Sequence, residues 1–149
     1  MKTCDILLVD DNENDVELAL RAFKKNTVNG DIMVFMNGDD VLDYVFAKGS
    51  YAARDSRELP KLMLLDIKMP LANGFEVLRI IKTNPITRVM PVIMLSSSNQ
   101  ESDIRQCYAL GANSYIVKTV DFNAFSDQVK HIGEYWLKYN TIPKAVVEK

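Results

Sequence analysis

Short apolar runs alternate with stretches of helical periodicity along this chain. Five runs have the length and composition of β-strands: residues 5–9, 31–36, 61–65, 91–95 and 114–117. The first, third and fourth are apolar at consecutive positions, which is typical of central strands in a parallel sheet that helices cover on both faces.

The stretches between these runs predict helices. The first places Val16, Leu20 and Phe23 on one face, and Asn14 with Glu17 is a candidate capping box for its start. The next three helices are predicted near residues 38–46, 74–83 and 101–110, and Gly111 suits the position after the last of them.

The last predicted helix carries an aromatic stripe. Phe122, Phe125, Val129, Ile132 and Trp136 recur at helical spacing, with Tyr135 and Tyr139 beside them. The early part is expected to pack on the sheet. Trp136 and Tyr139 come so late that we expect little core to cover them, and an exposed apolar end favours a contact surface. A plain terminal helix and a self-association surface both remain open.

Five successive β-α units predict an α/β fold: a doubly wound, five-stranded parallel sheet of flavodoxin-like order 2-1-3-4-5, with helices on both faces. One domain is expected over residues 1–140, with residues 141–149 as a C-terminal tail. The segment 48–60 is longer than an average connection. It is interpreted as a surface loop opposite the acidic residues described below.

Composition and charge narrow the function classes. The 149 residues carry a net charge of −2 with both signs interspersed, which gives no electrostatic case for nucleic acid. Cys4 and Cys107 are far apart and His131 is the single histidine, so a disulfide framework, a zinc site and a His-rich centre are not expected. With no signal peptide and no membrane-spanning run, a cytoplasmic location is expected.

Acidic residues follow two of the predicted central strands. Asp10 and Asp11 end the first apolar run, and Asp66 ends the third. Adjacent parallel strands would bring all three to one edge, where like charges raise one another's pKa. A hard divalent cation such as Mg²⁺ relieves that repulsion.

Two further strand ends supply a hydroxyl and an ammonium group. The fourth predicted strand leads into Ser96 and the fifth into Lys118. A carboxylate nucleophile, a metal-bound acid pair, a lysine and a hydroxyl are the groups that phosphoryl transfer requires. Each residue alone has a simpler interpretation. The aspartates or Ser96 could cap a helix, and Lys118 could be an ordinary surface lysine.

Four motifs in order give a family resemblance: LLVDDN, LLDIKMPLANGFEVL, VIMLSSS and ALGANSYIVK. Together they resemble the receiver domain of two-component response regulators. The resemblance implies that Asp66 is the phosphoacceptor, that Asp11 binds Mg²⁺ directly and Asp10 largely through water, and that the backbone carbonyl of Lys68 is a further ligand.

The same resemblance assigns the remaining site residues. Ser96 would be the switch hydroxyl, Tyr115 the switch aromatic residue and Lys118 the phosphate-binding lysine. Pro70 and Gly74 match the turn after the acceptor, where glycine would permit an unusual φ.

One position departs from the family pattern. The family usually has proline after the lysine, commonly with a cis peptide, whereas Thr119 follows Lys118 here. A cis bond without proline costs about 2.5–4 kcal/mol. The bond is therefore expected to be trans, or to be held cis at that cost.

The resemblance also implies partners. A sensor histidine kinase would phosphorylate Asp66, and Lys-Thr, the 48–60 segment and the tail EYWLKYNTIP resemble small regulators that partner bacterial phytochromes. Output would be protein contact, including a homodimer through the fourth and fifth strand-helix elements and the aromatic helix. No enzymatic activity is expected beyond the chain's own phosphorylation and dephosphorylation.

Two other function classes use a similar pattern. A haloacid-dehalogenase-like phosphatase has a strand-end aspartate nucleophile but needs a second acid two residues later, where this chain has Lys68. A flavodoxin-like electron carrier shares the fold, but Asp10 and Asp11 stand where its phosphate-binding loop would be and would repel FMN phosphate.

Overall fold

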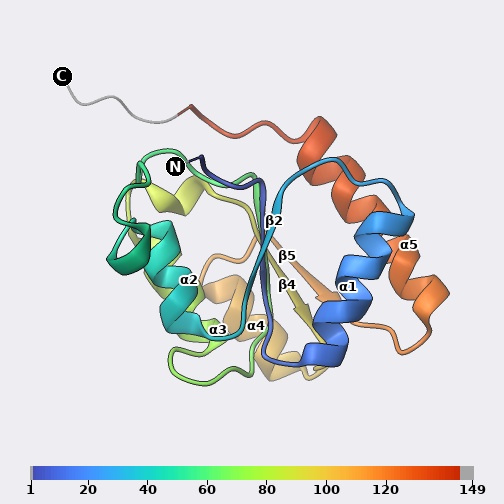
Figure 1. Cartoon of the computed structure of the whole chain (residues 1–149). Helices are drawn as coiled ribbons and strands as arrows, with labels where there is room; N and C mark the ends of the chain where they lie inside the picture. Colours follow the sequence, from blue (N-terminus) through green and yellow to red (C-terminus); the bar gives the residue numbers. More distant parts are fainter. Residues whose placement is uncertain (1, 145–149) are drawn as a thin grey trace.

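A five-stranded parallel sheet forms the centre of the computed structural model, which describes residues 2–144 (Figure 1). Its spatial order is β2-β1-β3-β4-β5, so the predicted doubly wound fold is confirmed. The strands are β1 (Ile6–Val9), β2 (Ile32–Phe35), β3 (Leu62–Leu65), β4 (Val92–Ser96) and β5 (Ser114–Val117).

The central strands are buried along their whole length, as their apolar runs predict. Every residue of β1, β3 and β4 is buried, whereas β2 and β5 at the sheet edges are largely half-exposed. Val9 pairs with Leu65 in register. The residues that follow β1 and β3 therefore leave the sheet side by side.

Helices cover both faces of the sheet and enclose two separate cores. α1 (Glu13–Lys25) and α5 (Phe122–Gly133) lie together on one face, and α2 (Gly38–Val45), α3 (Gly74–Thr83) and α4 (Glu101–Ala109) lie on the other (Figure 1). Alternate strand residues point to opposite faces. Ile6 and Leu8 accordingly pack towards α1 and α5, while Leu7 and Val9 pack into the other core.

Asparagine side chains cap the starts of α1, α2 and α3. Asn37 and Asn73 accept hydrogen bonds at the starts of α2 and α3. The predicted Asn14–Glu17 capping box is wrong: α1 begins two residues earlier, where Asn12 Oδ1 accepts from the Asp15 backbone N–H at 3.0 Å. Gly111 follows α4 with a φ of 104°, as expected for a residue that ends a helix.

The C-terminal helix changes geometry at Gly133. It continues as a π-helical segment, η3 (Glu134–Tyr139), which Asn140 closes by donating to the Tyr135 carbonyl at 2.7 Å. Tyr139 is 75% exposed, as predicted. The expectation for Trp136 is wrong, because its ring is half-buried against the α1–α5 core.

The segment 48–60 lies at the amino edge of the sheet and is not the plain surface loop expected. After a short 3₁₀ turn, η1 (Gly49–Tyr51), it buries Arg54 to 3% exposure. The Arg54 guanidinium donates to the carbonyls of Tyr44 and Val45 at the end of α2 and to Thr3 Oγ1. A charged loop residue thus caps a helix and belongs to the interior.

The described part of the tail runs along the same edge. Residues 141–144 have no regular structure, and Ile142 and Pro143 line a cavity with Leu59 and Val89, the latter in the 3₁₀ turn η2 (Thr87–Val89). Residues 145–149 of the expected tail lie outside the described residues. No helix within residues 2–144 is long and apolar enough to cross a bilayer.

Candidate functional site

Three carboxylates meet beyond the carboxyl ends of β1 and β3. Asp10, Asp11 and Asp66 each offer a carboxylate oxygen, and these oxygens lie within 4.8 Å of one another. Asp10 is buried, Asp66 is half-buried and Asp11 is exposed. The cluster therefore has one side embedded in the protein and one side open to solvent.

Backbone donors hold two of these carboxylates in place. Asp10 Oδ1 accepts from the Asn12 N–H at 3.0 Å, and Asp66 Oδ1 accepts from the Ile67 N–H at 2.8 Å. One oxygen of each side chain is thus fixed locally. The other oxygen of each, Oδ2, faces the ammonium group of Lys118.

Lys118 lies inside the acidic cluster. Its Nζ is 2.7 Å from Asp10 Oδ2, 3.1 Å from Asp15 Oδ2 and 3.7 Å from Asp66 Oδ2. The strand ends bring Lys118 to the acids as expected. Asp15 was missed because an acid in the first turn of a helix is common, and only its place opposite β5 distinguishes it.

Burial and neighbouring charge shift the two central ionisable groups. Desolvation, reinforced by the charge of Asp10, raises the pKa of Asp66 from 3.8 to about 6, although the Lys118 charge opposes this. Burial alone would lower the pKa of Lys118, but the carboxylates outweigh it and the net pKa is raised. Lys118 is therefore a permanent cation, and Asp66 ionises reluctantly without a further positive charge.

Ser96 opens onto the same space as Asp66. Both line a cavity of about 420 Å³ together with Lys68, Ser97 and Ser98. Ser96 is buried, and its Oγ accepts from the Ser98 N–H at 3.1 Å. A group attached to Asp66 would therefore enter a space with a hydroxyl on one wall.

Tyr115 lies one step further from the acids. Its ring packs partly buried against the core beneath α4, and its hydroxyl reaches the carbonyl of Ser98 at 2.8 Å. Tyr115 therefore contacts the loop that carries the serines rather than the carboxylates themselves.

The turn after Asp66 differs from the expectation for glycine. The left-handed φ of 61° belongs to Leu71, whereas Gly74 is the first residue of α3. A Cβ at Gly74 would overlap the Asp66 carbonyl oxygen and lie 2.7 Å from Ile67 Cα. Close backbone approach, and not backbone conformation, requires glycine here.

Among the described peptide bonds none is cis, so Lys118–Thr119 is trans.

The donor set of the cluster fits a hard divalent cation. Asp10, Asp11 and Asp66 provide carboxylate oxygens, which Mg²⁺ and Mn²⁺ accept. The two cysteines are buried elsewhere, in the core on the α2–α4 face of the sheet, so soft ligands do not compete. The open side at Asp11 leaves room for ligands that the protein does not supply.

Comparisons with known proteins agree with this site. The model of the response regulator receiver domain matches residues 6–130. The chain is 37% identical over 139 residues to the probable methanogenesis regulatory protein FilR2 of Methanothrix harundinacea, covering 93% of this chain and 86% of the relative. It is 31% identical over 140 residues to response regulator Rcp1 of Synechocystis, covering 94% and 93%.

Solved structures give the same result. Phosphorylated RcpA, a cyanobacterial phytochrome response regulator, superposes with a TM-score of 0.86 at 35% identity, over 96% of this chain and 100% of that one. Mn²⁺-bound Rcp1 superposes with a TM-score of 0.84 at 30% identity, over 95% and 99%.

Because the family model covers most of the chain and full-length relatives share its fold, this protein belongs to the response regulator receiver domain family of signalling phosphoacceptors, which bind a divalent metal at an acidic cluster.

Proposed function

We propose that Asp66 accepts a phosphoryl group from a histidine kinase and that Mg²⁺ is the metal beside it. The observation that carries this proposal is the convergence of Asp10, Asp11 and Asp66 within 4.8 Å, with Lys118 Nζ 3.7 Å from Asp66. Asp66 is the member of the cluster that also lines the 420 Å³ cavity. That cavity has space for a phosphoryl group.

The residues divide the work of transfer. An Asp66 carboxylate oxygen attacks phosphorus, a P–O bond forms, and the P–N bond to the kinase histidine breaks with its electron pair leaving on nitrogen. Lys118 offers a positive charge to a phosphoryl oxygen and Ser96 a hydrogen bond to another. Asp10, Asp11, Asp66 and the Lys68 carbonyl would hold Mg²⁺, which neutralises the charge of the phosphoryl oxygens when bound.

The test uses acetyl phosphate as a small phosphodonor. The wild-type chain with Mg²⁺ is expected to take up one phosphoryl group, detected as a mass increase that hydroxylamine removes. Asp66→Asn is expected to fold and to take up none. Asp127→Asn, an exposed acid on α5, is the matched control and should label like wild type. Stoichiometric labelling of Asp66→Asn would contradict the assignment.

The proposed output is a change of surface rather than turnover of a substrate. Ser96 would turn towards the phosphoryl group and Tyr115 would move inward, so that β4, β5 and their helices change shape. The chain would catalyse only its own phosphorylation and dephosphorylation. Multiple turnovers of a small phosphate ester by the purified protein would favour the phosphatase alternative instead.

The proposed kinase is of the phytochrome type. Support comes from RcpA and Rcp1, the first of which is described as a phytochrome response regulator. Phosphotransfer from an autophosphorylated bacterial phytochrome should be faster than from an unrelated histidine kinase. Equal rates from both would count against this choice of partner.

Self-association is proposed through β5, α4 and the C-terminal helix. Exposed apolar side chains lie along these elements: Tyr108, Val117, Tyr135 and Tyr139. Sedimentation with and without beryllofluoride tests the idea, with Tyr135→Ser/Tyr139→Ser as the disrupting variant. A monomer in both states would contradict it.

The proposed receiver boundary at residue 140 rests on the hydrogen bond that closes η3 there. A chain ending at Asn140 is expected to keep its fold and its acetyl phosphate labelling. Loss of cooperative unfolding after this truncation would place the boundary later.

A further inference from the structure

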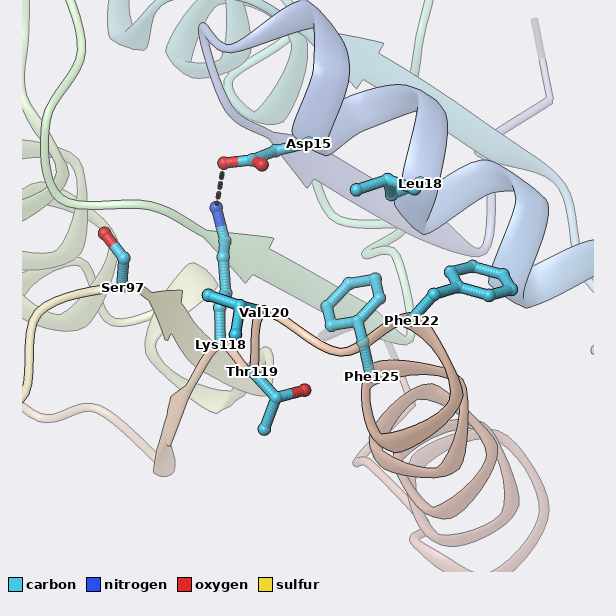
Figure 2. Close-up of a pocket in the computed structure, with 8 residues that line it drawn as sticks. All are labelled: Asp15, Leu18, Ser97, Lys118, Thr119, Val120, Phe122 and Phe125. Atoms are coloured by element: carbon cyan, nitrogen blue, oxygen red, sulfur yellow. Dashed lines mark hydrogen bonds and ion pairs between the residues drawn. The ribbon is translucent and has the colours of Figure 1, made fainter.

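Asp15 holds the lysine of the phosphorylation site from a second direction. It lies in the first turn of α1, and its Oδ2 is 3.1 Å from Lys118 Nζ (Figure 2). Its backbone N–H is fixed by the Asn12 side chain. The carboxylate is therefore presented to Lys118 from a rigid position.

Three carboxylates share the one ammonium group but differ in exposure. The side chains of Asp10 and Asp66 are 5% and 16% exposed, whereas that of Asp15 is 39% exposed. Asp15 is also not a member of the metal-capable cluster. It is thus the carboxylate that can keep Lys118 when Asp10 and Asp66 turn to a metal ion.

The Asp15–Lys118 ion pair also links α1 to the end of β5. Lys118 follows β5 and Asp15 belongs to α1, and both line a cavity of about 250 Å³ with Val120, Phe122 and Phe125 (Figure 2). Figure 2 shows the pair at the side of this cavity that faces Ser97. Because Lys118 Nζ is also 2.7 Å from Asp10 and 3.7 Å from Asp66, the ion pair lies where this cavity meets the phosphorylation site.

We propose that Asp15 is a positioning residue that competes with Asp10 and Asp66 for Lys118. It thereby controls how easily Lys118 releases these two carboxylates to a metal ion and how strongly it binds the phosphoryl group. This inference rests on the proposed phosphoacceptor function. In the metal-free protein, Asp15 draws Lys118 away from the metal ligands. After phosphorylation, it competes with the phosphoryl oxygen for the same ammonium group.

Opposite effects on two ligands follow from this competition. Without the Asp15 carboxylate, Lys118 pairs more firmly with Asp10 and Asp66, and one negative charge near the metal is lost, so Mg²⁺ binds more weakly. In the same variant at saturating Mg²⁺, Lys118 has no Asp15 carboxylate to pair with and therefore binds the phosphoryl group more strongly. A substitution that only disturbed the local structure would weaken the binding of both Mg²⁺ and the phosphoryl group.

The experiment compares wild type, Asp15→Asn and Asp15→Glu, all as full chains. Mg²⁺ affinity is measured by calorimetry at fixed ionic strength, and beryllofluoride affinity by ¹⁹F NMR at saturating Mg²⁺. For Asp15→Asn, the Mg²⁺ Kd should rise about two- to fivefold and the beryllofluoride Kd should fall by about the same factor, given the strength of partly exposed ion pairs. Asp15→Glu keeps the charge and should restore the Mg²⁺ Kd.

Glu13→Gln is the matched control. Glu13 lies in the same helical turn, is exposed and, in the described part of the chain, is not an ion-pair partner of Lys118. It should change neither Kd by more than about 1.5-fold, because an exposed charge outside an ion pair contributes little.

The outcomes separate this inference from the proposed function. If Asp15→Asn leaves both dissociation constants unchanged, or raises both, the positioning role is overturned. The phosphoacceptor proposal would still stand. A wild-type chain that binds neither Mg²⁺ nor beryllofluoride would overturn the proposed function, and the role of Asp15 with it.

Discussion

The hydroxyl of Tyr115 donates a 2.8 Å hydrogen bond to the backbone carbonyl of Ser98, 17 residues earlier in the chain. This bond ties β5 to the loop that follows β4. Ser97 and Ser98 of this loop line the phosphorylation cavity together with Ser96, the last residue of β4. Any movement of Tyr115 must therefore break or replace a contact with the loop of the site.

Tyr115→Phe removes that bond and little else. We expect the free energy of unfolding to fall by about 1 kcal/mol, and the amides of residues 97–100 to exchange faster with deuterium. Mg²⁺ affinity should be nearly unchanged, because the Tyr115 hydroxyl bonds to a backbone carbonyl and not to a carboxylate of the cluster. Tyr108→Phe, on a half-exposed ring of α4, is the control. Unchanged exchange in this loop would contradict the coupling.

Asp66 destabilises the metal-free fold when it is ionised. Its folded-state pKa of about 6 lies above the ordinary 3.8, so the folded state binds this proton more tightly than the unfolded chain does. The penalty is complete above pH 6 and disappears as pH falls towards 4. In EDTA at pH 7.5, Asp66→Asn should therefore be more stable than wild type by up to about 3 kcal/mol, because each unit of pKa shift corresponds to about 1.4 kcal/mol.

Urea unfolding of both proteins at pH 7.5 and pH 4.5 measures this difference. The gap between variant and wild type should shrink at the lower pH, and Asp127→Asn should show no such change. A gap that is independent of pH would mean that burial does not raise the pKa of Asp66.

Arg54 should be the most sensitive residue of the segment 48–60. Arg54→Met removes the guanidinium donors from the carbonyls of Tyr44, Val45 and Glu58. The Tyr44 and Glu58 carbonyls keep a bond from the Ala47 N–H and from Thr3 Oγ1, whereas the Val45 carbonyl loses its side-chain donor. We expect a loss of about 3 kcal/mol in unfolding free energy. Arg54→Lys should not rescue it, because an ammonium group cannot reproduce the planar fork of donors.

Arg57→Met, on an exposed side chain three residues later, should change stability by less than about 0.5 kcal/mol. Equal stability of the Arg54 and Arg57 variants would show that the buried guanidinium does not support α2.

Gly74→Ala should damage the site through its backbone. The added Cβ would collide with the Asp66 carbonyl, so either α3 or the end of β3 must shift. We expect a loss of at least about 2 kcal/mol in stability and weaker Mg²⁺ binding by calorimetry. Gly30→Ala, whose Cβ would lie 3.3 Å from Asp5 Cβ, is the milder comparison. Unchanged Mg²⁺ affinity in Gly74→Ala would contradict the link between this turn and the site.

The strands could be predicted to within one residue because burial on both faces leaves an uninterrupted apolar signal. The convergence of Asp10, Asp11, Asp66 and Lys118 followed from strand order alone, since parallel strands place their ends at one edge. Both features depend on strong constraints that the sequence carries directly: burial of the central strands and their parallel order.

The features that sequence did not predict depend on tertiary contact. Asn12 and Asn14 both suit a helix cap, and only the path of the chain after β1 selects Asn12. Arg54 lies in a polar segment whose composition gives no sign of burial. Asp15 becomes part of the site only because α1 passes beside the end of β5.

Trp136, the one tryptophan of the chain, follows α5 in η3 with its ring 4.8 Å from that of Tyr135. It lies 14 residues after Phe122, or roughly 20 Å along a helix from the end of α5 nearest the site. Intrinsic fluorescence therefore carries no direct signal of ligand entry. A change in its emission on adding beryllofluoride would instead report that rearrangement at Asp66 had travelled the length of the helix.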